Sequence, residues 1–555
     1  MANDRKKNHD VSRRRFLRDG ATLGIGATTL TGVASQETSV AAQRPNRWDR
    51  TADVVVVGGG VSGLCAAIMA RDQGASVVIV ETNHDIGGHG MVSGGRVPLG
   101  GGTSLQKKYG VVDSAEQVYL DHTAPSNLGF RYSDRDLVRV WADENAPTME
   151  FLLENGVKFI DQMPTVVNGG TVPRLFRSQV FSEDLKVTIA GNPGSGLVRG
   201  LERSARAKGV EILLNHSLTR IVRESPSSGR VQGVTATVQG KPLNIQARRG
   251  VVIATGGHTG NVAFRRIFDP RLTEEYQVAG EPWTKQNADG ELLAMAIGAS
   301  LWATGNQTAE RGSPITKTRH IGCRYGYINL RWQPQSPMFP LAGASGLTVD
   351  SFQNVIIVNE TGRRFWNEMD DSFAFLNACF SRHANRGRNS KTENGGGPIW
   401  AIFDADAVVR EKWDPKPPNV DPKGWFFTAD TIAELAGRIV SPYQQQPIAP
   451  AVLAETVAKY NSYVDMGKDA EFGKPTPLFK IQKPPFYAAW ATPILHDTLT
   501  GLKINRKCQV IDLHGQVITG LYAAGESAGG FALHGLPRVT VFGRIAGREA
   551  ARAET

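Results

Sequence analysis

Residues 53 to 81 decide the fold, and they read DVVVVGGGVSGLCAAIMARDQGASVVIVE. The run Val54 to Val57 consists of β-branched apolar residues, which predicts a buried parallel strand. The stretch from Leu64 to Asp72 predicts a helix, and Val77 to Val80 predicts a second buried strand. A strand, a glycine turn, a helix and a strand in this order are typical of a doubly wound α/β domain that binds a dinucleotide.

The glycines between the first strand and the helix form a G-x-G-x-x-G pattern. We expect Gly58 to allow the tight turn, Gly60 to let the backbone approach a pyrophosphate, and Gly63 to let the helix pack on the strand. The helix N-terminus adds free N–H groups and a positive dipole end. An acid that closes the second strand accepts hydrogen bonds from ribose hydroxyls. The predicted cofactor contacts here are Gly58, Gly60, Val61, Ser62, Gly63 and Glu81.

The motif alone does not separate FAD from NAD, but three later segments favour FAD. Residues 87–102 are dense in glycine, which suggests backbone lying against an extended cofactor. Residues 251–257, VVIATGG, predict another buried strand that ends in a glycine turn. Residues 520–526, GLYAAGE, repeat the order of strand, glycine and acid.

Together these segments resemble the flavoprotein family of fumarate reductase, succinate dehydrogenase and ketosteroid dehydrogenase. The resemblance extends to residues 287–290 (NADG), 358–368 (VNETGRRFWNE) and 542–547 (FGRIAG). It implies an α/β chain in which a Rossmann-type FAD-binding domain carries an inserted α+β clamp domain that caps the substrate. The expected boundaries are 43–305 and 496–555 for the FAD-binding domain and 306–495 for the clamp.

The resemblance also implies cofactor contacts beyond the glycine motif. Glu526 is expected to bind the ribityl chain of the flavin. A covalent bond between His89 and FAD is one alternative and a non-covalent contact the other, and the short spacing to Gly94 and Gly95 favours the second. The expected additional contacts are Gly88, His89, Gly94, Gly95, Thr255, Gly256, Asp289, Glu526, Val539 and Thr540.

Two further segments have a local pattern. Residues 211–250 alternate apolar and polar side chains around Pro226 to Gly229, which predicts a hairpin. Residues 386–397 are rich in Arg, Asn, Ser and Gly and are expected to form an exposed loop.

The first 42 residues resemble a twin-arginine export signal. Residues 12–18 read SRRRFLR, with Arg13 and Arg14 as the pair, and a weakly apolar run follows from Gly20 to Ala34. Residues 40–42, VAA, fit a cleavage site. The resemblance implies that residues 1–42 are a signal peptide and that the mature protein is periplasmic or secreted. A disordered basic tail is the alternative.

Composition narrows the classes of partner. The 555 residues carry a net charge of +10, without a dense basic run after residue 42, so a nucleic acid is not expected as a ligand. No run reaches the length of a membrane span. The four cysteines form neither a zinc spacing nor a c-type haem motif, and Cys65 is expected to be a buried helix residue. A metal site is not expected, and electrons must come from or go to a separate partner.

The family's chemistry requires a donor that holds an activating oxygen and a group that exchanges a proton. Arg538 resembles the substrate-binding Arg of fumarate reductases, although about eight residues that follow it in the family are missing here. Its replacement by Ala is expected to lower turnover and to leave the flavin content intact. His496 and Asp497 stand where the family has two histidines, and Tyr487 is a further hydrogen-bond donor. The predicted catalytic residues are Arg538, His496, Asp497 and Tyr487.

Position 372 argues against fumarate and succinate as substrates. The family's proton-delivering Arg is Ser372 here, after Asp370 and Asp371. The leading hypothesis is an exported FAD-dependent oxidoreductase that dehydrogenates or reduces a carbon–carbon bond next to a carbonyl or carboxylate of a small organic molecule. The alternatives are a hydratase or isomerase that contains flavin, and a non-catalytic electron-transfer flavoprotein. The first is favoured because the resemblance includes the substrate-capping domain.

Overall fold

The computed structural model describes residues 45–127, 133–167, 170–181, 192–302, 315–327, 330–380, 397–533 and 535–555. The described residues belong to one compact unit of the chain, residues 44–555. The predicted signal peptide and residues 386–396 of the predicted loop lie outside the described residues.

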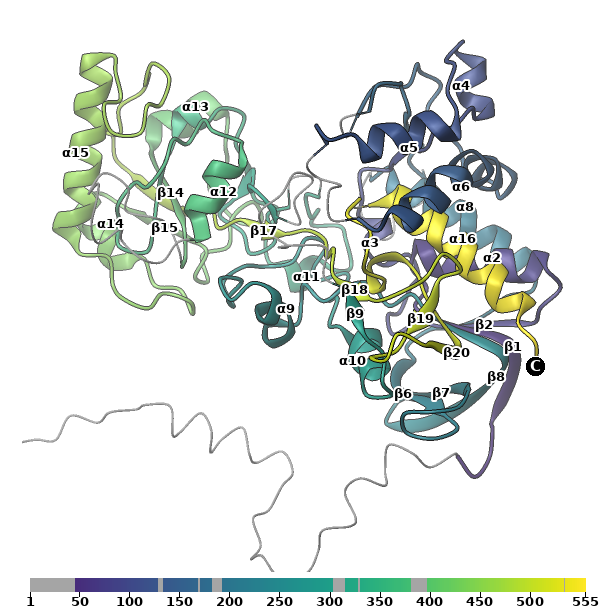
Figure 1. Cartoon of the computed structure of the whole chain (residues 1–555). Helices are drawn as coiled ribbons and strands as arrows, with labels where there is room; N and C mark the ends of the chain where they lie inside the picture. Colours follow the sequence, from purple (N-terminus) through teal and green to yellow (C-terminus); the bar gives the residue numbers. More distant parts are fainter. Residues whose placement is uncertain are drawn as a thin grey trace, which may run out of the picture. The chain divides into compact units, whose positions relative to one another are not determined.

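The described residues form an eight-stranded sheet around the first predicted strand, β1 (Arg50–Val57). This strand pairs in parallel with β2 (Val77–Val80) on one side and with β8 (Lys241–Ile253) on the other (Figure 1). The sheet continues through β5 (Glu211–Leu213) beside β2, and through β20 (Val517–Ala523) and β19 (Gln509–Ile511) beside β8. The parallel α/β core predicted from residues 53–81 is therefore confirmed. All four valines of the predicted strand are at most 2% exposed, as a strand covered on both faces requires.

The predicted hairpin is also confirmed. Strands β6 (Ser217–Arg223) and β7 (Val231–Val238) pair in antiparallel fashion, and the turn between them contains Pro226 to Gly229. Strand β7 pairs in turn with β8, so the hairpin is joined to the main sheet.

Helix α2 (Val61–Asp72) follows β1 and packs along the last helix, α16 (Leu536–Arg552) (Figure 1). Two glycines of α16 allow this close crossing. A Cβ atom at Gly543 would lie 2.4 Å from the carbonyl oxygen of Ser62, and one at Gly547 would lie 2.0 Å from that of Ala66. Cys65 lies in α2 with no exposed surface, as expected.

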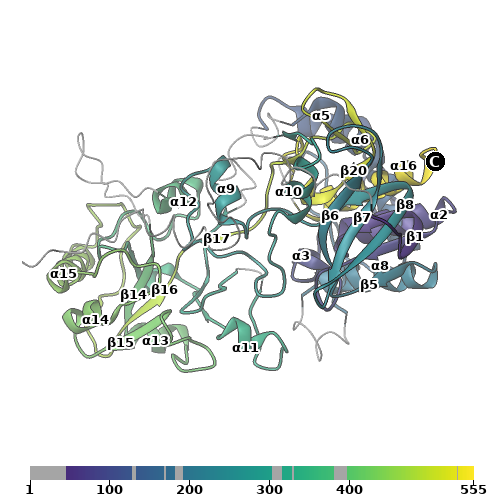
Figure 2. The ribbon, with the colours of Figure 1, turned by 90° about the horizontal axis from the view of Figure 1, so that it is seen from below.

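A second, four-stranded antiparallel sheet has the order β13-β14-β16-β15. Figure 2 shows α13, α14 and α15 around it. Its elements are β13 (Ile356–Val358), β14 (Trp400–Asp404), α13 (Ala405–Glu411), β15 (Phe426–Ala429), α14 (Ile432–Arg438), α15 (Pro450–Met466) and β16 (Phe486–Trp490). All of them fall inside the range 306–495 predicted for the clamp. The exact domain boundaries stay a prediction.

A buried ion cluster stabilises this second sheet. Arg364 donates to both oxygens of Glu368, at 2.7 and 2.8 Å, and to Asp469 at 2.9 Å. Lys474 lies 3.6 Å from Glu368. Glu368 in the family-like segment 358–368 is therefore held by cations of its own domain.

The remaining elements connect these two sheets or cover them. They are α3 (Gly88–Met91), β3 (Arg96–Pro98), α4 (Ser104–Lys108), α5 (Ala115–Thr123), α6 (Arg135–Glu154), β4 (Leu175–Arg177), α8 (Gly194–Ala207), α9 (Val262–Phe268), α10 (Asp289–Met295), β9 (Leu301–Trp302), β10 (Ile315–Thr316), β11 (His320–Ile321), α11 (Phe339–Ala342), β12 (Leu347–Thr348), η3 (Phe352–Asn354), α12 (Phe373–Phe380), β17 (Ile494–Leu495), β18 (Gly501–Leu502) and η4 (Gly525–Ser527).

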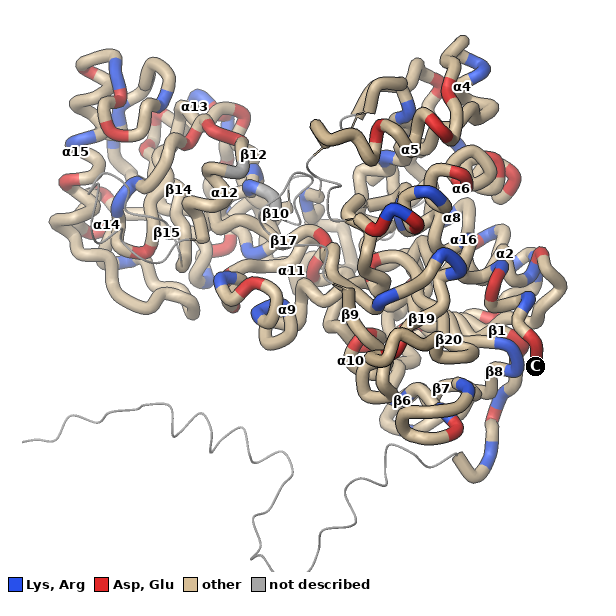
Figure 3. The backbone as a smooth tube through the Cα atoms, in the orientation of Figure 1, with Lys and Arg blue, Asp and Glu red and all other residues tan. Residues whose placement is uncertain are grey.

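Figure 3 shows Lys and Arg interspersed with Asp and Glu along the described helices and strands. None of the described helices combines the length and the apolar character needed to cross a membrane.

Candidate active site

A cavity of about 650 Å³ opens where β1, β2 and β8 end. Its size falls in the range of about 300 to 1,000 Å³ that is usual for ligand sites. Its wall includes most of the predicted cofactor contacts, namely Gly58, Gly60, Val61, Ser62, Glu81, Gly88, His89, Thr255, Gly256, Asp289, Glu526 and Val539. His496 and Asp497 line the same cavity.

The three glycines of the motif differ in what surrounds them. A Cβ atom at Gly58 would lie 2.2 Å from the carbonyl oxygen of Ala254, and its φ of +104° disfavours any other residue. A Cβ atom at Gly63 would lie 1.9 Å from the carbonyl oxygen of Gly58, so this glycine lets α2 pack on the turn. A Cβ atom at Gly60 would lie 4.0 Å from its nearest neighbour, the carbonyl oxygen of Gly87. The space that a side chain would fill at Gly60 is therefore part of the cavity.

Glu81 is fixed at the end of β2 by two backbone N–H groups. Gly59 donates to one carboxylate oxygen at 2.6 Å and Asn83 to the other at 2.8 Å. Burial raises the pKa of Glu81, and these two hydrogen bonds oppose the shift. The carboxylate retains acceptor capacity on the cavity side, which suits the hydroxyls of a ribose.

The wall of the cavity beyond β8 is also held by short polar contacts. The hydroxyl of Ser527 donates to the carbonyl oxygen of Gly256 at 2.8 Å. Asp289 begins α10 and lines the cavity, and burial raises its pKa. The indole of Trp283 donates to the carbonyl oxygen of Gly88 at 3.1 Å, which ties the segment before α10 to α3.

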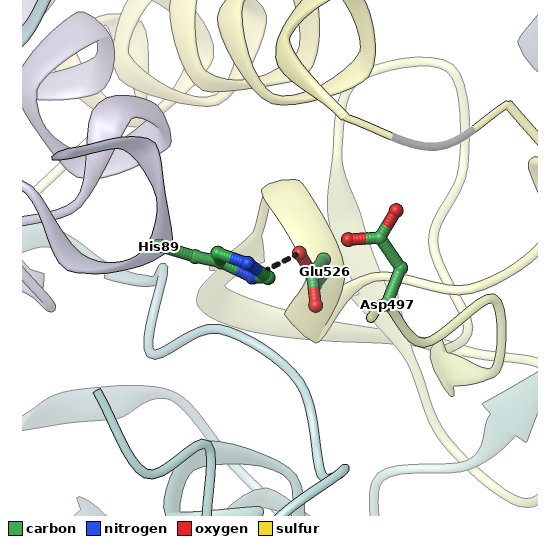
Figure 4. Close-up of side chains that lie close together, drawn as sticks. All are labelled: His89, Asp497 and Glu526. Carbon is green, nitrogen blue, oxygen red and sulfur yellow. Dashed lines mark ion pairs between the residues drawn. The ribbon is translucent and has the colours of Figure 1, made fainter. Parts of the chain in front are cut away.

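Three predicted side chains meet at one end of the cavity, as Figure 4 shows. Glu526 of η4 lies between His89 of α3 and Asp497. An imidazole nitrogen of His89 and one carboxylate oxygen from each of the two acids all lie within 4.8 Å of one another. His89 Nδ1 is 3.9 Å from Glu526 Oε1. Gln286 donates to Glu526 Oε2 at 2.9 Å. Burial, together with the neighbouring Asp497 carboxylate, raises the pKa of Glu526 well above its usual value.

His496 reaches the same region from the end of β17. Its Nε2 lies 2.5 Å from the hydroxyl oxygen of Tyr327, and the two rings stack with their centroids 5.0 Å apart. Its Nδ1 lies 3.5 Å from Asp497 Oδ2. The imidazole of His89 stands edge-on to that of His496 at 5.3 Å. The structure therefore brings His89, His496, Asp497 and Glu526 together.

The other two predicted catalytic residues lie elsewhere. Arg538 is 1% exposed, and its guanidinium donates to the carbonyl oxygens of Thr498, at 3.0 Å, and Ala528. Burial lowers its pKa, which the nearby Glu526 and Asp497 oppose. Tyr487 lies in β16, stacked on Phe403 at 5.2 Å in the core of the second sheet. Neither residue lines the cavity within the described part of the chain, and their catalytic roles stay predictions.

Four predicted cofactor contacts are also absent from the cavity wall formed by the described residues. Gly63 has the packing role given above. A Cβ atom at Gly95 would lie 2.4 Å from Ser178 Oγ, and Thr540 donates to the carbonyl oxygen of Leu536 at 2.8 Å. Gly94 has open space around it.

Several residues of the cavity wall were not predicted from the sequence. Three of them, Trp283, Lys285 and Gln286, belong to the segment just before the NADG turn, and the continuity of the chain was the available signal for these three. Others are Asn83, His216 and Gly535.

These observations fit a bound dinucleotide. Gly60 leaves its side-chain space to the cavity, the N-terminus of α2 faces it, and Glu81 holds acceptors toward it. At the other end, Glu526 is surrounded by the amide of Gln286, the imidazole of His89 and the carboxyl group of Asp497. FAD has an anionic pyrophosphate, hydroxyls and a polar ring edge, and each finds a matching group in this wall.

Comparisons with known proteins identify relatives over nearly the whole chain. A family model described as "FAD binding domain" matches residues 53–308 and 331–538. A probable fumarate reductase of Shewanella frigidimarina is 27% identical over 521 residues, which cover 90% of this chain and 75% of that protein. An NADH:acrylate oxidoreductase of Vibrio harveyi is 28% identical, and the match covers 94% of this chain but only 53% of that protein.

A solved structure, the open conformation of a flavocytochrome c3 fumarate reductase, superposes with a TM-score of 0.62 at 25% identity. The match covers 91% of this chain and 79% of that one.

Proposed function

The chain belongs to the family described as "FAD binding domain", and on this premise we propose that it exchanges two hydrogens across a carbon–carbon bond next to a carbonyl, in a substrate other than fumarate or succinate. The predictions of FAD as cofactor and of a FAD-dependent oxidoreductase are confirmed by the family match and by the reductases among its relatives. The substrate, the roles of the site residues and the cell compartment are proposals.

Bound FAD supplies a ring that gives or takes a hydride. The residues that would hold it are the turn at Gly58 to Ser62, Glu81 at the ribose, and Glu526 with Gln286 at the ribityl chain. His496 is the proposed proton-exchanging group, because it lines the cavity and its imidazole has two polar neighbours. Asp497 stabilises the charged form of that imidazole.

One observation favours an uncharged substrate. Asp497 and Glu526 line the cavity side by side, and the negative charge of Asp497 contributes to the raised pKa of Glu526. Two unit charges 4 Å apart interact by about 4 kcal/mol at an effective dielectric constant of 20. A substrate carboxylate that came within about 4 Å of Asp497 would meet a repulsion of this order, whereas an amide, ketone or ester oxygen would not.

Acrylate and acrylamide test this proposal, because they share the same carbon–carbon double bond and differ in charge. The flavin is reduced anaerobically, and its reoxidation by each compound and by fumarate is followed by absorbance. We expect acrylamide to be the better acceptor. In Asp497→Asn the ratio of the two rates should shift toward acrylate. A preference for acrylate or fumarate in the wild type would refute the uncharged-substrate proposal.

The same assay separates the alternative functions. Conversion of a substrate without any change in the flavin spectrum would identify a hydratase or isomerase. An electron-transfer flavoprotein would be reoxidised by redox dyes but by none of the unsaturated compounds.

We also propose that the protein is exported through its twin-arginine-like segment and exchanges electrons with a separate partner. The order of Arg13-Arg14, apolar run and small residues supports export, and the absence of a Cys-x-x-Cys-His motif from the sequence supports a separate partner. Export should stop in Arg13→Lys with Arg14→Lys, measured by cell fractionation, while the flavin content of the retained protein stays normal. Continued export of that variant would refute the signal.

A further inference from the structure

Tyr327 has a contact that none of the sequence motifs indicates. It lies 169 residues before His496 in the chain, yet its hydroxyl oxygen is 2.5 Å from His496 Nε2. Its ring stacks on the imidazole with an interplanar angle of 29°. Tyr327 is 2% exposed and does not line the cavity, whereas His496 does.

The two nitrogens of His496 therefore face different groups. Nε2 forms the short hydrogen bond to the phenol, and Nδ1 lies on the side of Asp497, which shares the cavity wall. When the imidazole is protonated both of its nitrogens carry a proton, so Nε2–H donates to the phenol oxygen of Tyr327, and this bond fixes the orientation of the ring. Nδ1 is then the nitrogen that meets a substrate.

We propose that Tyr327 is a positioning residue for His496: it holds Nε2–H, so that Nδ1 exchanges the proton of the reaction. This inference rests on the proposed function. In the direction of reduction, bound FAD would supply the hydride that the β carbon receives, and Nδ1 of His496 gives its proton to the α carbon. The π bond is replaced by two C–H bonds, the imidazolium becomes neutral imidazole, and Nε2–H stays on Tyr327. Dehydrogenation is the reverse.

The charged groups around His496 favour this cycle. Asp497 follows it in the chain, His89 contacts it from α3, and Glu526 lies next to both of them. Arg538 is behind this group, bound to the carbonyl oxygen of Thr498. The Asp497 carboxylate stabilises the imidazolium, and Tyr327 determines which of its protons is held.

Tyr327→Phe removes the hydroxyl and keeps the ring. Without its acceptor, Nε2–H is left in a buried position, which disfavours the imidazolium. We expect kcat to fall about 10- to 100-fold, which is less than the roughly 10²- to 10⁴-fold of a whole acid–base contribution, because His496 itself stays in place. The limb of the pH–rate profile due to His496 should move to lower pH, while KM and flavin content stay unchanged.

The matched control is Tyr276→Phe. Tyr276 is also 2% exposed, and its hydroxyl donates to the carbonyl oxygen of Cys379 at 2.9 Å, away from the cavity. The two variants lose similar buried hydrogen bonds, so a loss of stability common to both is no evidence for positioning. The double variant with His496→Gln gives a second control, because Tyr327→Phe should then have no further effect on kcat.

A direct readout does not require turnover. Histidine NMR of labelled protein, with the His496 signal assigned by its loss in His496→Gln, reports the tautomer and the pKa of the imidazole. We expect Tyr327→Phe to lower that pKa and Tyr276→Phe to leave it unchanged. An unchanged pKa and pH profile in Tyr327→Phe would overturn the inference and leave the proposed function intact. If Tyr327→Phe lowered the pKa of His496 as expected but no unsaturated compound reoxidised the flavin, the proposed function would be refuted and the contact between Tyr327 and His496 would stand.

Discussion

Gly60 and Gly63 are three residues apart in one motif, but substitution by Ala should have opposite consequences at the two positions. Gly60 has φ −69° and ψ −178°, an extended conformation that Ala adopts without strain, and its Cβ would lie 4.0 Å from the nearest atom. Gly60→Ala should leave the apoprotein as stable as the wild type, or up to about 1 kcal/mol more stable, because the unfolded chain loses freedom.

The same methyl group points into the cavity and would keep the pyrophosphate from the N–H groups of the turn. Hydrogen bonds to a charged group contribute about 1.5 to 3 kcal/mol. At 1.4 kcal/mol per factor of ten, the loss of one such bond raises the Kd of FAD about 10- to 100-fold.

Gly63→Ala should instead destabilise the protein itself. Its Cβ would lie 1.9 Å from the carbonyl oxygen of Gly58, whereas ordinary contacts begin at 3.4 Å. Helix α2 must move to relieve this clash, and overpacking of this kind costs about 1 to 3 kcal/mol. Gly437→Ala in α14, where nothing lies within 4 Å, is the control for the effect of Ala in a helix.

The assay has two arms. Urea unfolding of the apoprotein measures stability, and titration of apoprotein with FAD by flavin fluorescence measures Kd. Wild-type affinity for FAD in Gly60→Ala would refute the assignment of this cavity to the cofactor. Unchanged unfolding of Gly63→Ala would refute the packing argument for that glycine.

Three further predictions concern buried charges. Burial raises the pKa of Glu281 from 4.5 to about 7. Because the pKa is higher in the folded state, the proton on Glu281 stabilises the fold fully below pH 4.5, and this stabilisation is lost as the pH rises through 7. The free energy of unfolding of the wild type should therefore fall by about 3 kcal/mol over this range. Glu281→Gln should lack this pH dependence, as measured by urea unfolding at pH 5 and 9. Arg364→Ala leaves Glu368 and Asp469 buried without their guanidinium partner and should cost about 3 to 5 kcal/mol in the unfolding of the second sheet, with a surface variant such as Arg438→Ala close to wild type. Arg538→Ala should lose flavin and activity together, because the contacts of Arg538 with two carbonyl oxygens hold the cavity wall beside Glu526. The flavin content is read from the flavin-to-protein absorbance ratio. Intact flavin with lost turnover would instead support the substrate-binding role predicted from the sequence.

The sequence predicted those parts of the molecule that depend on local pattern. The β1–α2–β2 unit could be predicted from four valines, three glycines and a closing glutamate, because all of them lie within 29 consecutive residues. The strands around Gly256 and Glu526 were found for the same reason. These segments line a single cavity because their strands pair in parallel in one sheet. The sequence indicated this only through the family resemblance.

Contacts between residues that are far apart in the sequence could not be predicted from local pattern. Arg538 follows a recognisable motif, but it lies in the first turn of α16, where its guanidinium donates to backbone carbonyls. Tyr327 belongs to no motif, and its contact with His496 arises from the folding of two distant segments. Trp283 and Gln286 reach the cavity because their segment is tied to α3, which no periodicity indicates.

The close crossing of α2 and α16 has a consequence for biosynthesis. Residue 58 begins the cofactor turn, but the helix that covers α2 is completed only with residue 552, and strand β20 enters the sheet after residue 517. A ribosome that has made nine tenths of the chain still holds a nucleotide-binding turn without its covering helix. The cofactor cavity is therefore complete only when η4 and α16, which line it, are in place.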